Sequence, residues 1–330
     1  MKFNSRLSEC FSRDANSISR KKLEKNIKKW LYAIFRAFFL ISVSYIVIYP
    51  LLYMLASAFK SPSEALDPSV VWVPKHLSLE GMGVAFELME YPRALFTSIT
   101  TLIIPGIVEV FTCALVAYGL ARFKFRGKNL IFILVMMTIL VPPQVMVAPL
   151  YLQYAHLDFF GILKLIGNII GHDIRPRVVD SFMTFMLPSL FGAGLRSGLF
   201  IFIYRQFFAG LPRELEEAAY VDGASPFYTF VRIILPSSGA AILCVLLFSV
   251  IWHWNEFDLS TIFMSGNYPL PYMLSNLKSM VIQRASGYTM ASVVDITMAG
   301  CVLFLTPVLV FYLIAQRKFI QSIARIGIVG

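Results

Sequence analysis

The chain has 330 residues, of which 58% are hydrophobic and 15% are charged, and its mean hydropathy is +0.71. Soluble globular proteins carry about 25% charged residues, so the composition and the long apolar runs exclude an ordinary soluble domain and predict an all-α integral membrane protein. The net charge of +10 would suit a nucleic-acid-binding protein, but the positions of the basic residues argue against that class.

The N-terminal segment, residues 1–30, is polar and holds nine Lys and Arg residues. We interpret it as a cytoplasmic segment whose later half is either disordered or an amphipathic helix on the membrane surface. An apolar run from Ala37 to Phe59 follows it. Because about 20 apolar residues cross a bilayer, this run predicts a first membrane span that is kinked or broken near Pro50.

Five further apolar runs predict five more membrane spans. They cover Ala94–Ala121, Asn129–Gln153, Ser181–Phe208, Gly239–Trp254 and Thr289–Ala315. The predicted domain organisation is therefore a transmembrane domain of six helices over residues 31–315, followed by a basic tail, residues 316–330.

Two of these spans carry residues that disturb or tighten helix packing. Pro142 and Pro143 interrupt the third span, and the carbonyls that they free need partners from protein or water. We therefore expect this break in the bundle interior or in a pore wall. Three glycines in the fourth span, Gly192, Gly194 and Gly198, allow close helix approach.

The basic residues divide unevenly between the two sets of polar segments that connect the spans. The predicted inner segments hold 19 Lys and Arg residues, including four in 122–128, and the predicted outer segments hold 8. Positive charge favours the cytoplasmic side, so both termini and residues 210–236 are predicted to be cytoplasmic. The positive charge then has anionic lipid headgroups as neighbours rather than nucleic acid.

The longest polar interruption of the second half runs from Gly210 to Pro236. Pro212 and the acidic residues after it are typical of a helix start, and Gly223 is typical of a helix end because glycine adopts the left-handed conformation. Ser225, followed by proline, predicts the N-cap of a second helix. Its apolar stripe is predicted to consist of Phe227, Phe230 and Ile234.

Such a helix–turn–helix is either a hydrophilic connection or a docking element for a cytoplasmic partner. Its residues resemble the EAA loop of permease subunits from bacterial ABC importers. The resemblance is carried by Glu217-Ala218-Ala219, Asp222-Gly223-Ala224 and Ile233-Ile234-Leu235-Pro236. Strings elsewhere between about residues 30 and 330 are similar to maltose-type, binding-protein-dependent carbohydrate permeases: Tyr118–Phe123, Arg205–Phe208, Trp254–Phe257 and Gln316–Phe319.

This resemblance implies a multi-pass subunit of the bacterial cell membrane that forms half of the translocation pathway for a sugar or oligosaccharide. It implies a second, homologous permease subunit as heterodimer partner, two ATP-binding subunits, and an extracytoplasmic solute-binding protein. ATP and Mg²⁺ would bind the ATPase partners, so no cofactor is expected in this chain. The residues implied to couple to the ATPase are Glu217, Ala218, Ala219, Asp222, Gly223 and Ala224.

Ionisable groups within membrane spans are costly and are candidates for a functional role. Arg196 and Glu109 meet this description, with an internal ion pair as the alternative. Aromatic faces with polar neighbours at the end of the fifth span suit a sugar, although an aromatic belt at the membrane interface is the alternative. The predicted pathway residues are Gln144, Arg196, Trp254, Asn255 and Glu256.

Other functional classes have weaker support in the sequence. An ion-coupled secondary transporter that needs no ATPase remains the alternative, but such proteins favour paired broken helices with intramembrane carboxylates, and one break stands out here. The four cysteines and four histidines are scattered without the spacing of metal ligands. Neither a catalytic constellation nor a metal site is predicted.

Overall fold

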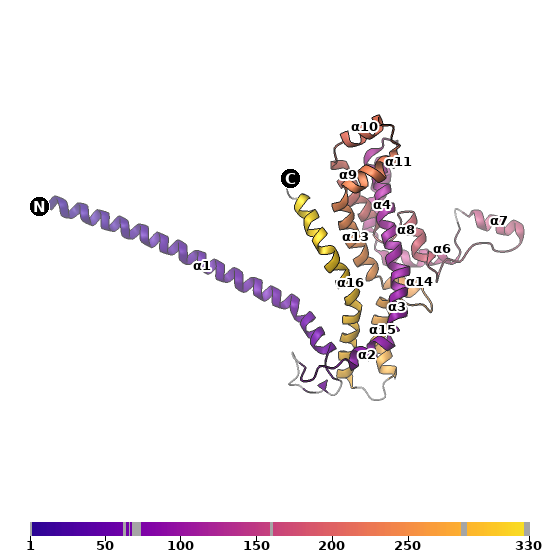
Figure 1. The fold of residues 1–330 in the computed structure, drawn as a ribbon, viewed down its shortest axis with the longest axis horizontal. Coiled ribbons are helices and arrows are strands. Elements are labelled where there is room, and N and C mark those ends of the chain that lie inside the picture. The colour runs from indigo at the N-terminus through magenta and orange to yellow at the C-terminus, as the bar shows by residue number, and fades with distance from the viewer. Residues whose placement is uncertain are drawn as a thin grey trace.

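The computed structural model describes residues 2–61, 64–65, 67, 74–158, 161–284 and 289–326. Helices dominate the described residues, which contain no strand, and most of them form one elongated bundle (Figure 1). Helix α1 (Lys2–Ala58) projects away from the bundle and bends before it reaches it (Figure 1).

The remaining elements follow in chain order. They are α2 (Glu80–Leu88), α3 (Tyr91–Ser98), η2 (Ile99–Ile103), α4 (Ile104–Arg122), α5 (Lys128–Leu140), α6 (Pro143–Ala155), α7 (Ile162–Ile170), α8 (Met183–Leu190), α9 (Ser197–Gly210), α10 (Glu214–Val221), α11 (Pro226–Thr229), η3 (Phe230–Ile234), α12 (Leu235–Ser237), α13 (Gly239–Trp254), α14 (Asp258–Phe263), α15 (Leu270–Arg284) and α16 (Met290–Ile326). The elements η2 and η3 are π-helical.

Three helical segments of the described chain are long and apolar enough to cross a membrane: Ile27–Ala58, Tyr91–Arg122 and Met290–Arg317. Two bent pairs also qualify when each pair is counted as one span. They are α5 with α6, bent by 106°, and Pro226–Ser237 with α13, bent by 82°. The described residues thus provide up to five spans by length and composition.

The structure differs from several of the predicted boundaries. The first span was predicted to be kinked or broken near Pro50; the break is excluded, because α1 stays helical through that residue. The predicted fourth span is divided into α8 and α9, with residues 191–196 between them. The basic tail continues α16 as helix as far as Ile326, and the rest of the tail lies outside the described residues.

Helix α4 lies at the centre of the bundle and packs against α8, α9 and α13, while α16 packs against α13 and α15. The C-terminal half of α4 contributes to an apolar cluster that includes several aromatic rings. Tyr118 of α4 lies 6.1 Å from Phe208 of α9 and 5.0 Å from Phe230 of η3, measured between ring centroids. The close approach of helices at Gly198 is confirmed, since a Cβ there would lie 2.9 Å from the Val135 carbonyl oxygen of α5.

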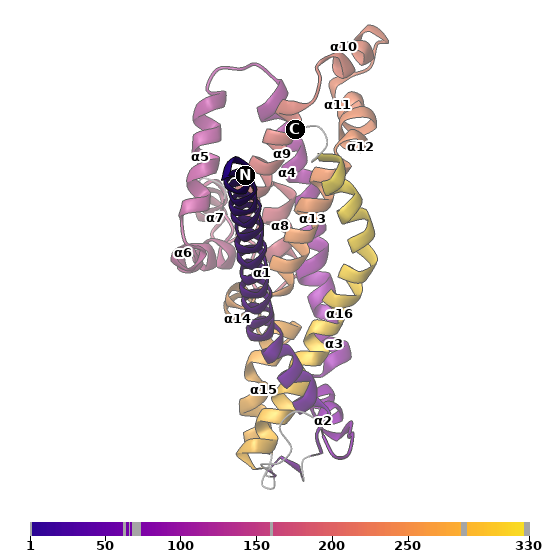
Figure 2. The same cartoon turned by 90° about the vertical axis from the view of Figure 1, so that its left-hand side faces the viewer.

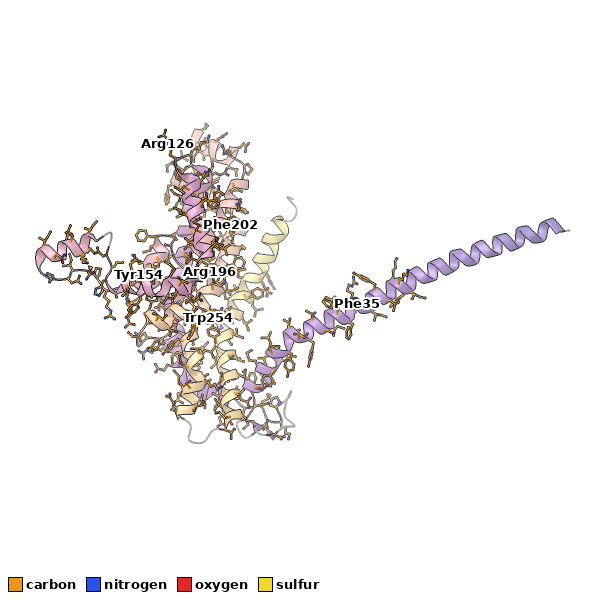
Figure 3. All side chains as sticks on the ribbon, turned by 180° about the vertical axis from the view of Figure 1, so that it is seen from behind. Phe35, Arg126, Tyr154, Arg196, Phe202 and Trp254 are labelled. Atoms are coloured by element: carbon orange, nitrogen blue, oxygen red, sulfur yellow. The ribbon has the colours of Figure 1, made fainter. Side chains whose placement is uncertain are left out.

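The two ends of the bundle carry different elements. Helices α10 and α11 lie at one end, and α2 and α15 lie at the other (Figure 2). Arg126, in the short basic turn after α4, lies at the α10 end (Figure 3). The basic turn and residues 210–236 therefore share one end of the molecule, as the charge distribution requires.

Helix α7 projects sideways from the bundle on the connection between α6 and α8 (Figure 1). Beside it, Arg175 forms hydrogen bonds of 2.8 and 2.7 Å with the two carboxylate oxygens of Asp173. These bonds hold the pKa of the Asp173 carboxyl well below its usual range. The pair is partly exposed to solvent.

Candidate functional site

The 210–236 segment folds as a helix, a tight turn and a second helix at the end of the bundle. Gly223 has φ +79°, the left-handed conformation that was predicted to end the first helix. The Ser225 hydroxyl oxygen accepts a 3.3 Å hydrogen bond from the Tyr228 backbone N–H, which confirms the predicted N-cap. Helix α10 begins at Glu214, two residues after Pro212.

Most of the residues that the resemblance assigns to coupling are exposed on this segment. Glu217, Ala218, Asp222 and Gly223 are exposed, Ala224 is half-buried, and Ala219 is buried. Val221, between them, is 87% exposed. Helix α10 therefore presents a face of small, acidic and apolar groups that no described residue covers.

The apolar stripe of the second helix differs from the prediction. Phe230 and Ile234 are buried, with exposures of 5% and 0%, whereas Phe227 is 65% exposed. Phe227 belongs to α11 (Pro226–Thr229), whereas Phe230 and Ile234 are the first and last residues of the π-helical turn η3 (Phe230–Ile234). Phe227 lies outside this turn, on the solvent side.

A second site lies between the start of α9, the proline break before α6, and the end of α13. Four predicted pathway residues line a cavity of about 170 Å³: Gln144, Arg196, Asn255 and Glu256. The cavity also contains Trp252, which belongs to the aromatic cluster that the sequence places at the end of the fifth span, and Asp258, which the sequence reasoning did not select. The side-chain amide of Gln144 donates a 3.2 Å hydrogen bond to Asp258 Oδ2.

The tryptophans at the end of α13 have opposite surroundings. Trp252 lies under Arg196, whose Cζ is 5.7 Å from the ring centroid, and it stacks with Phe248 at 5.3 Å. Trp254 is instead buried, and its indole N–H donates a 3.2 Å hydrogen bond to the Phe304 carbonyl oxygen. Trp254 therefore does not line the polar cavity, whereas Trp252 does. Helical spacing alone indicates that residues two apart point to nearly opposite sides.

The sequence places Arg196 within the fourth span, but the structure places it directly before α9. It is the residue before α9 and has φ +64°, a conformation that is uncommon outside glycine. It is exposed beside the cavity rather than buried in a span. An adjoining cavity of about 520 Å³, with mostly apolar walls from α5, α6, α8 and α9, continues from it and includes Trp252 and Glu256.

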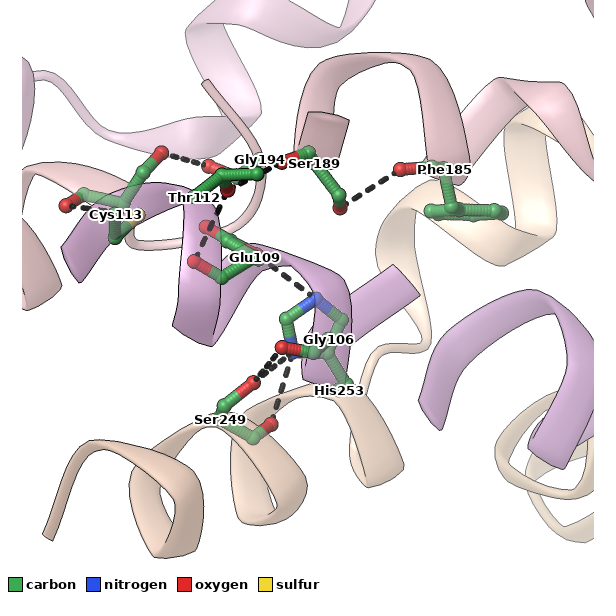
Figure 4. Close-up of polar contacts among 10 residues, drawn as sticks. Gly106, Glu109, Thr112, Cys113, Phe185, Ser189, Gly194, Ser249 and His253 are labelled. Carbon is green, nitrogen blue, oxygen red and sulfur yellow. Dashed lines mark hydrogen bonds and ion pairs between the residues drawn. The ribbon is translucent and has the colours of Figure 1, made fainter. Parts of the chain in front are cut away.

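Glu109 of α4 forms an internal ion pair, the alternative left open by the sequence. Its Oε2 lies 3.2 Å from Nε2 of His253 in α13, and the two side chains are 0% and 3% exposed (Figure 4). Nδ1 of His253 lies 2.9 Å from the Ser249 carbonyl oxygen, which only accepts, so Nδ1 carries a proton. The imidazole thus presents Nε2 to the Glu109 carboxyl.

Two glycines make room for this pair. A Cβ at Gly194 would lie 2.7 Å from Glu109 Oε2, and a Cβ at Gly106 would lie 2.9 Å from the His253 ring. The predicted close approach at Gly194 is thus confirmed, but the partner is a carboxylate rather than another helix backbone. The pair joins α4 to α13, and His253 also lines the larger, mostly apolar cavity.

A third polar contact joins α4 to the 210–236 segment. Arg122 Nε lies 3.2 Å from Glu216 Oε1, and both side chains are largely buried. Sequence reasoning treated Arg122 as part of a basic turn and Glu216 as one of several first-turn acids. Across the described residues, no group of three or more His, Cys, Asp or Glu side chains could hold a metal ion.

A family model described as "Binding-protein-dependent transport system inner membrane component" matches residues 110–325, from within α4 to the end of α16. This stretch includes both the exposed face of α10 and the residues before α9 and at the end of α13 that line the polar cavity. It also includes both partners of the buried Arg122–Glu216 pair.

Curated proteins of similar sequence extend over nearly the whole chain. The diacetylchitobiose uptake system permease protein NgcG of Streptomyces coelicolor is 28% identical over 290 residues, which cover 87% of this chain and 85% of that protein. The arabinooligosaccharides transport system permease protein AraQ of Halalkalibacterium halodurans is 25% identical, covering 94% of this chain and 100% of that protein.

Among solved structures, one similar chain comes from the crystal structure of a bacterial ABC transporter involved in the import of the acidic polysaccharide alginate. It aligns with a TM-score of 0.64 and 17% sequence identity, covering 88% of this chain and 96% of that chain. The two chains share a fold.

Proposed function

The chain belongs to the family of inner membrane components of binding-protein-dependent transport systems, and from this premise we propose that it is one of two permease subunits of an ATP-driven sugar importer. The two permeases would form a heterodimer, with the substrate pathway between them. The substrate would be an oligosaccharide, because NgcG and AraQ carry diacetylchitobiose and arabinooligosaccharides in their names.

The proposed topology has six membrane-spanning helices with both termini in the cytoplasm. Three long apolar helices and two bent pairs support it, and α8 with α9 would supply the remaining span. The basic turn that contains Arg126 and the 210–236 segment share one end of the bundle (Figure 3). The positive-inside rule assigns that end to the cytoplasm.

The observation that carries the proposal is the exposed face of α10 at that end. Glu217 and Ala218 are exposed beside Val221, and Gly223 sets the turn behind them with its positive φ. The importer would contain two ATP-binding subunits, which would hold ATP and Mg²⁺. One would bind α10 of this chain, and the other would bind the corresponding helix of the partner permease. Glu217 supplies a carboxylate for a charge-assisted contact, and small residues such as Ala218 allow another surface to approach closely.

The polar cavity would line this subunit's half of the pathway. Gln144, Asn255 and Glu256 provide donors and acceptors for hydroxyl groups, and Trp252 with Arg196 provides an aromatic face and a cation. A sugar needs this combination, since its ring faces are apolar and its edges carry hydroxyls. The apolar 520 Å³ cavity beside it would be closed by the partner permease.

The proposal is tested by reconstituting the chain in proteoliposomes with its partner permease, ATPase subunits and solute-binding protein. Labelled diacetylchitobiose, arabinotriose and maltotriose serve as transport probes. We expect uptake of at least one probe that requires internal ATP and the binding protein and that resists an ionophore. Uptake by this chain alone, abolished by the ionophore, would instead establish the ion-coupled secondary transporter.

A further inference from the structure

The guanidinium of Arg122, the last residue of α4, contacts two elements at the base of the 210–236 segment. Its Nη2 donates a 2.8 Å hydrogen bond to the Leu211 carbonyl oxygen, directly after α9 ends. Its Nε lies 3.2 Å from Glu216 Oε1 in the first turn of α10. One side chain therefore connects α4 both to the end of α9 and to the start of α10.

Burial makes this contact different from an ordinary surface ion pair. The Arg122 and Glu216 side chains are 6% and 10% exposed. Water and salt weaken exposed pairs until they contribute little, whereas a buried charge that loses its partner is strongly unfavourable. Separating α10 from α4 would leave both charges unpaired, so the pair opposes such a separation.

The second helix of the segment is also held by α4. The ring of Tyr118, one turn before Arg122, lies 5.0 Å from the ring of Phe230 in η3 and 6.1 Å from that of Phe208 in α9. Phe230 is 5% exposed. Both helices of the segment are thus anchored to the same turn of α4, one by charge and one by aromatic packing.

Neighbouring acids on α10 have separate environments. Glu216 is buried against α4, whereas Glu217, the next residue, is exposed on the face proposed to meet the ATPase. Consecutive residues of a helix are about 100° apart, so one acid faces the bundle while the other faces outward. Glu216 therefore contacts α4, whereas Glu217 is left for a contact with the ATPase.

We propose that Arg122 and Glu216 are positioning residues that fix the angle of α10 on α4. A displacement of α10 by the ATPase would then be transmitted to α4, and from there to the pathway, instead of being absorbed at the joint. This inference rests on the proposed function, because it requires that an ATPase subunit binds α10.

The test uses the complete transporter in proteoliposomes, with Glu216→Gln, Arg122→Gln and the double variant. Two quantities are measured: the molecules of the best-transported probe among diacetylchitobiose, arabinotriose and maltotriose imported per ATP hydrolysed, and the ATPase retained through purification. The matched control is Glu217→Gln, the same substitution one residue further on.

We expect each single variant to import at least fivefold fewer molecules per ATP while retaining the ATPase. The double variant should import no fewer than the single variants, because all three remove the same contact. Glu217→Gln should show the opposite result, with less ATPase retained and unchanged transport per ATP in the complexes that remain.

Unchanged transport per ATP in the single variants, additive losses in the double variant, or loss of the ATPase from Glu216→Gln would overturn the positioning role. A wild-type chain that retains no ATPase would overturn the proposed function, and the positioning role with it. If a single variant fails to reach the membrane, it is compared with the reversed pair, Arg122→Glu with Glu216→Arg. Only a specific contact between the two side chains would restore the amount of this chain in the membrane.

Discussion

Helix α4 takes part in two buried ion pairs, which differ in their ionisable groups and in the helices that they connect. Arg122 pairs with Glu216 near the end of the bundle, and Glu109 pairs with His253 in its interior. The two α4 residues are about 20 Å apart along the helix, at 1.5 Å per residue. The first pair holds an exposed helix, α10, and the second joins α4 to α13 beside the larger cavity.

The two pairs also differ in whether their ionisable groups must carry a charge. A guanidinium stays protonated in proteins, so the Arg122–Glu216 pair is a permanent ion pair and sits where solvent is near. A carboxyl and an imidazole each have a neutral form, which suits the fully buried place of Glu109 and His253 in a membrane protein. We therefore expect the inner pair to tolerate a neutral substitute better than the outer one.

The largest effect is expected from breaking the turn behind α10. Gly223 has φ +79°, whereas proline is fixed near −65°. We therefore expect Gly223→Pro to lower ATP-dependent uptake about 100-fold or more, while the chain still reaches the membrane. The control is Gly210→Ala, because nothing lies within 4 Å of a Cβ there. Normal uptake by Gly223→Pro would remove the turn from the mechanism.

The next effect sharpens the contrast between the two pairs. Glu109→Ala leaves His253 buried without its partner, and removing one member of a buried pair costs about 3–5 kcal/mol. We expect little folded protein in detergent, measured by size-exclusion profile and thermal unfolding. Glu109→Gln, which still offers an N–H or an oxygen to Nε2, should recover most of it. Equal losses in both variants would show that the amide cannot replace the carboxyl at Nε2.

A smaller, kinetic effect is expected in the polar cavity. Trp252→Ala removes the ring under Arg196 and should raise the apparent KM for the transported probe about fivefold, with maximal uptake little changed. Trp254→Phe is the control, because this residue packs against Phe304 away from the cavity. It should lower thermal stability without changing KM. The reverse pattern would restore the original assignment to Trp254.

The smallest effect is expected from an exposed ion pair. Arg175→Ala removes the partner that holds the pKa of Asp173 below its usual range, yet exposed pairs contribute only about 0–1 kcal/mol. Uptake should change less than twofold at pH 7. Because the Asp173 pKa is lowered in the folded chain, what stability the pair provides is lost only as pH falls through that lowered value. A large loss at pH 7 would show that α7 has a role in transport.

Local chemistry explains what the sequence could predict. The positive φ of Gly223, the N-cap at Ser225 and the break at Pro142–Pro143 follow from backbone preferences of single residues. The grouping of Gln144, Arg196, Asn255 and Glu256 at one cavity was also expected from their types.

The rest depended on packing between distant segments. Glu109 and His253 are 144 positions apart, and Arg122 and Glu216 are 94 apart, so no local pattern could pair them. The exposure of Phe227 likewise depends on which end of its helix reaches the bundle, and the apolar period along the sequence does not include this.

The most direct test of the account is site-directed crosslinking from α10. A single cysteine replaces Ala218, which is exposed on α10, in a chain whose own cysteines have been changed to serine, and a membrane-permeant bifunctional reagent is added to inverted vesicles. The account predicts a crosslink to the ATPase subunit that changes in yield when ATP is trapped with vanadate. Labelling of the same cysteine only from the outer face of intact cells would contradict it.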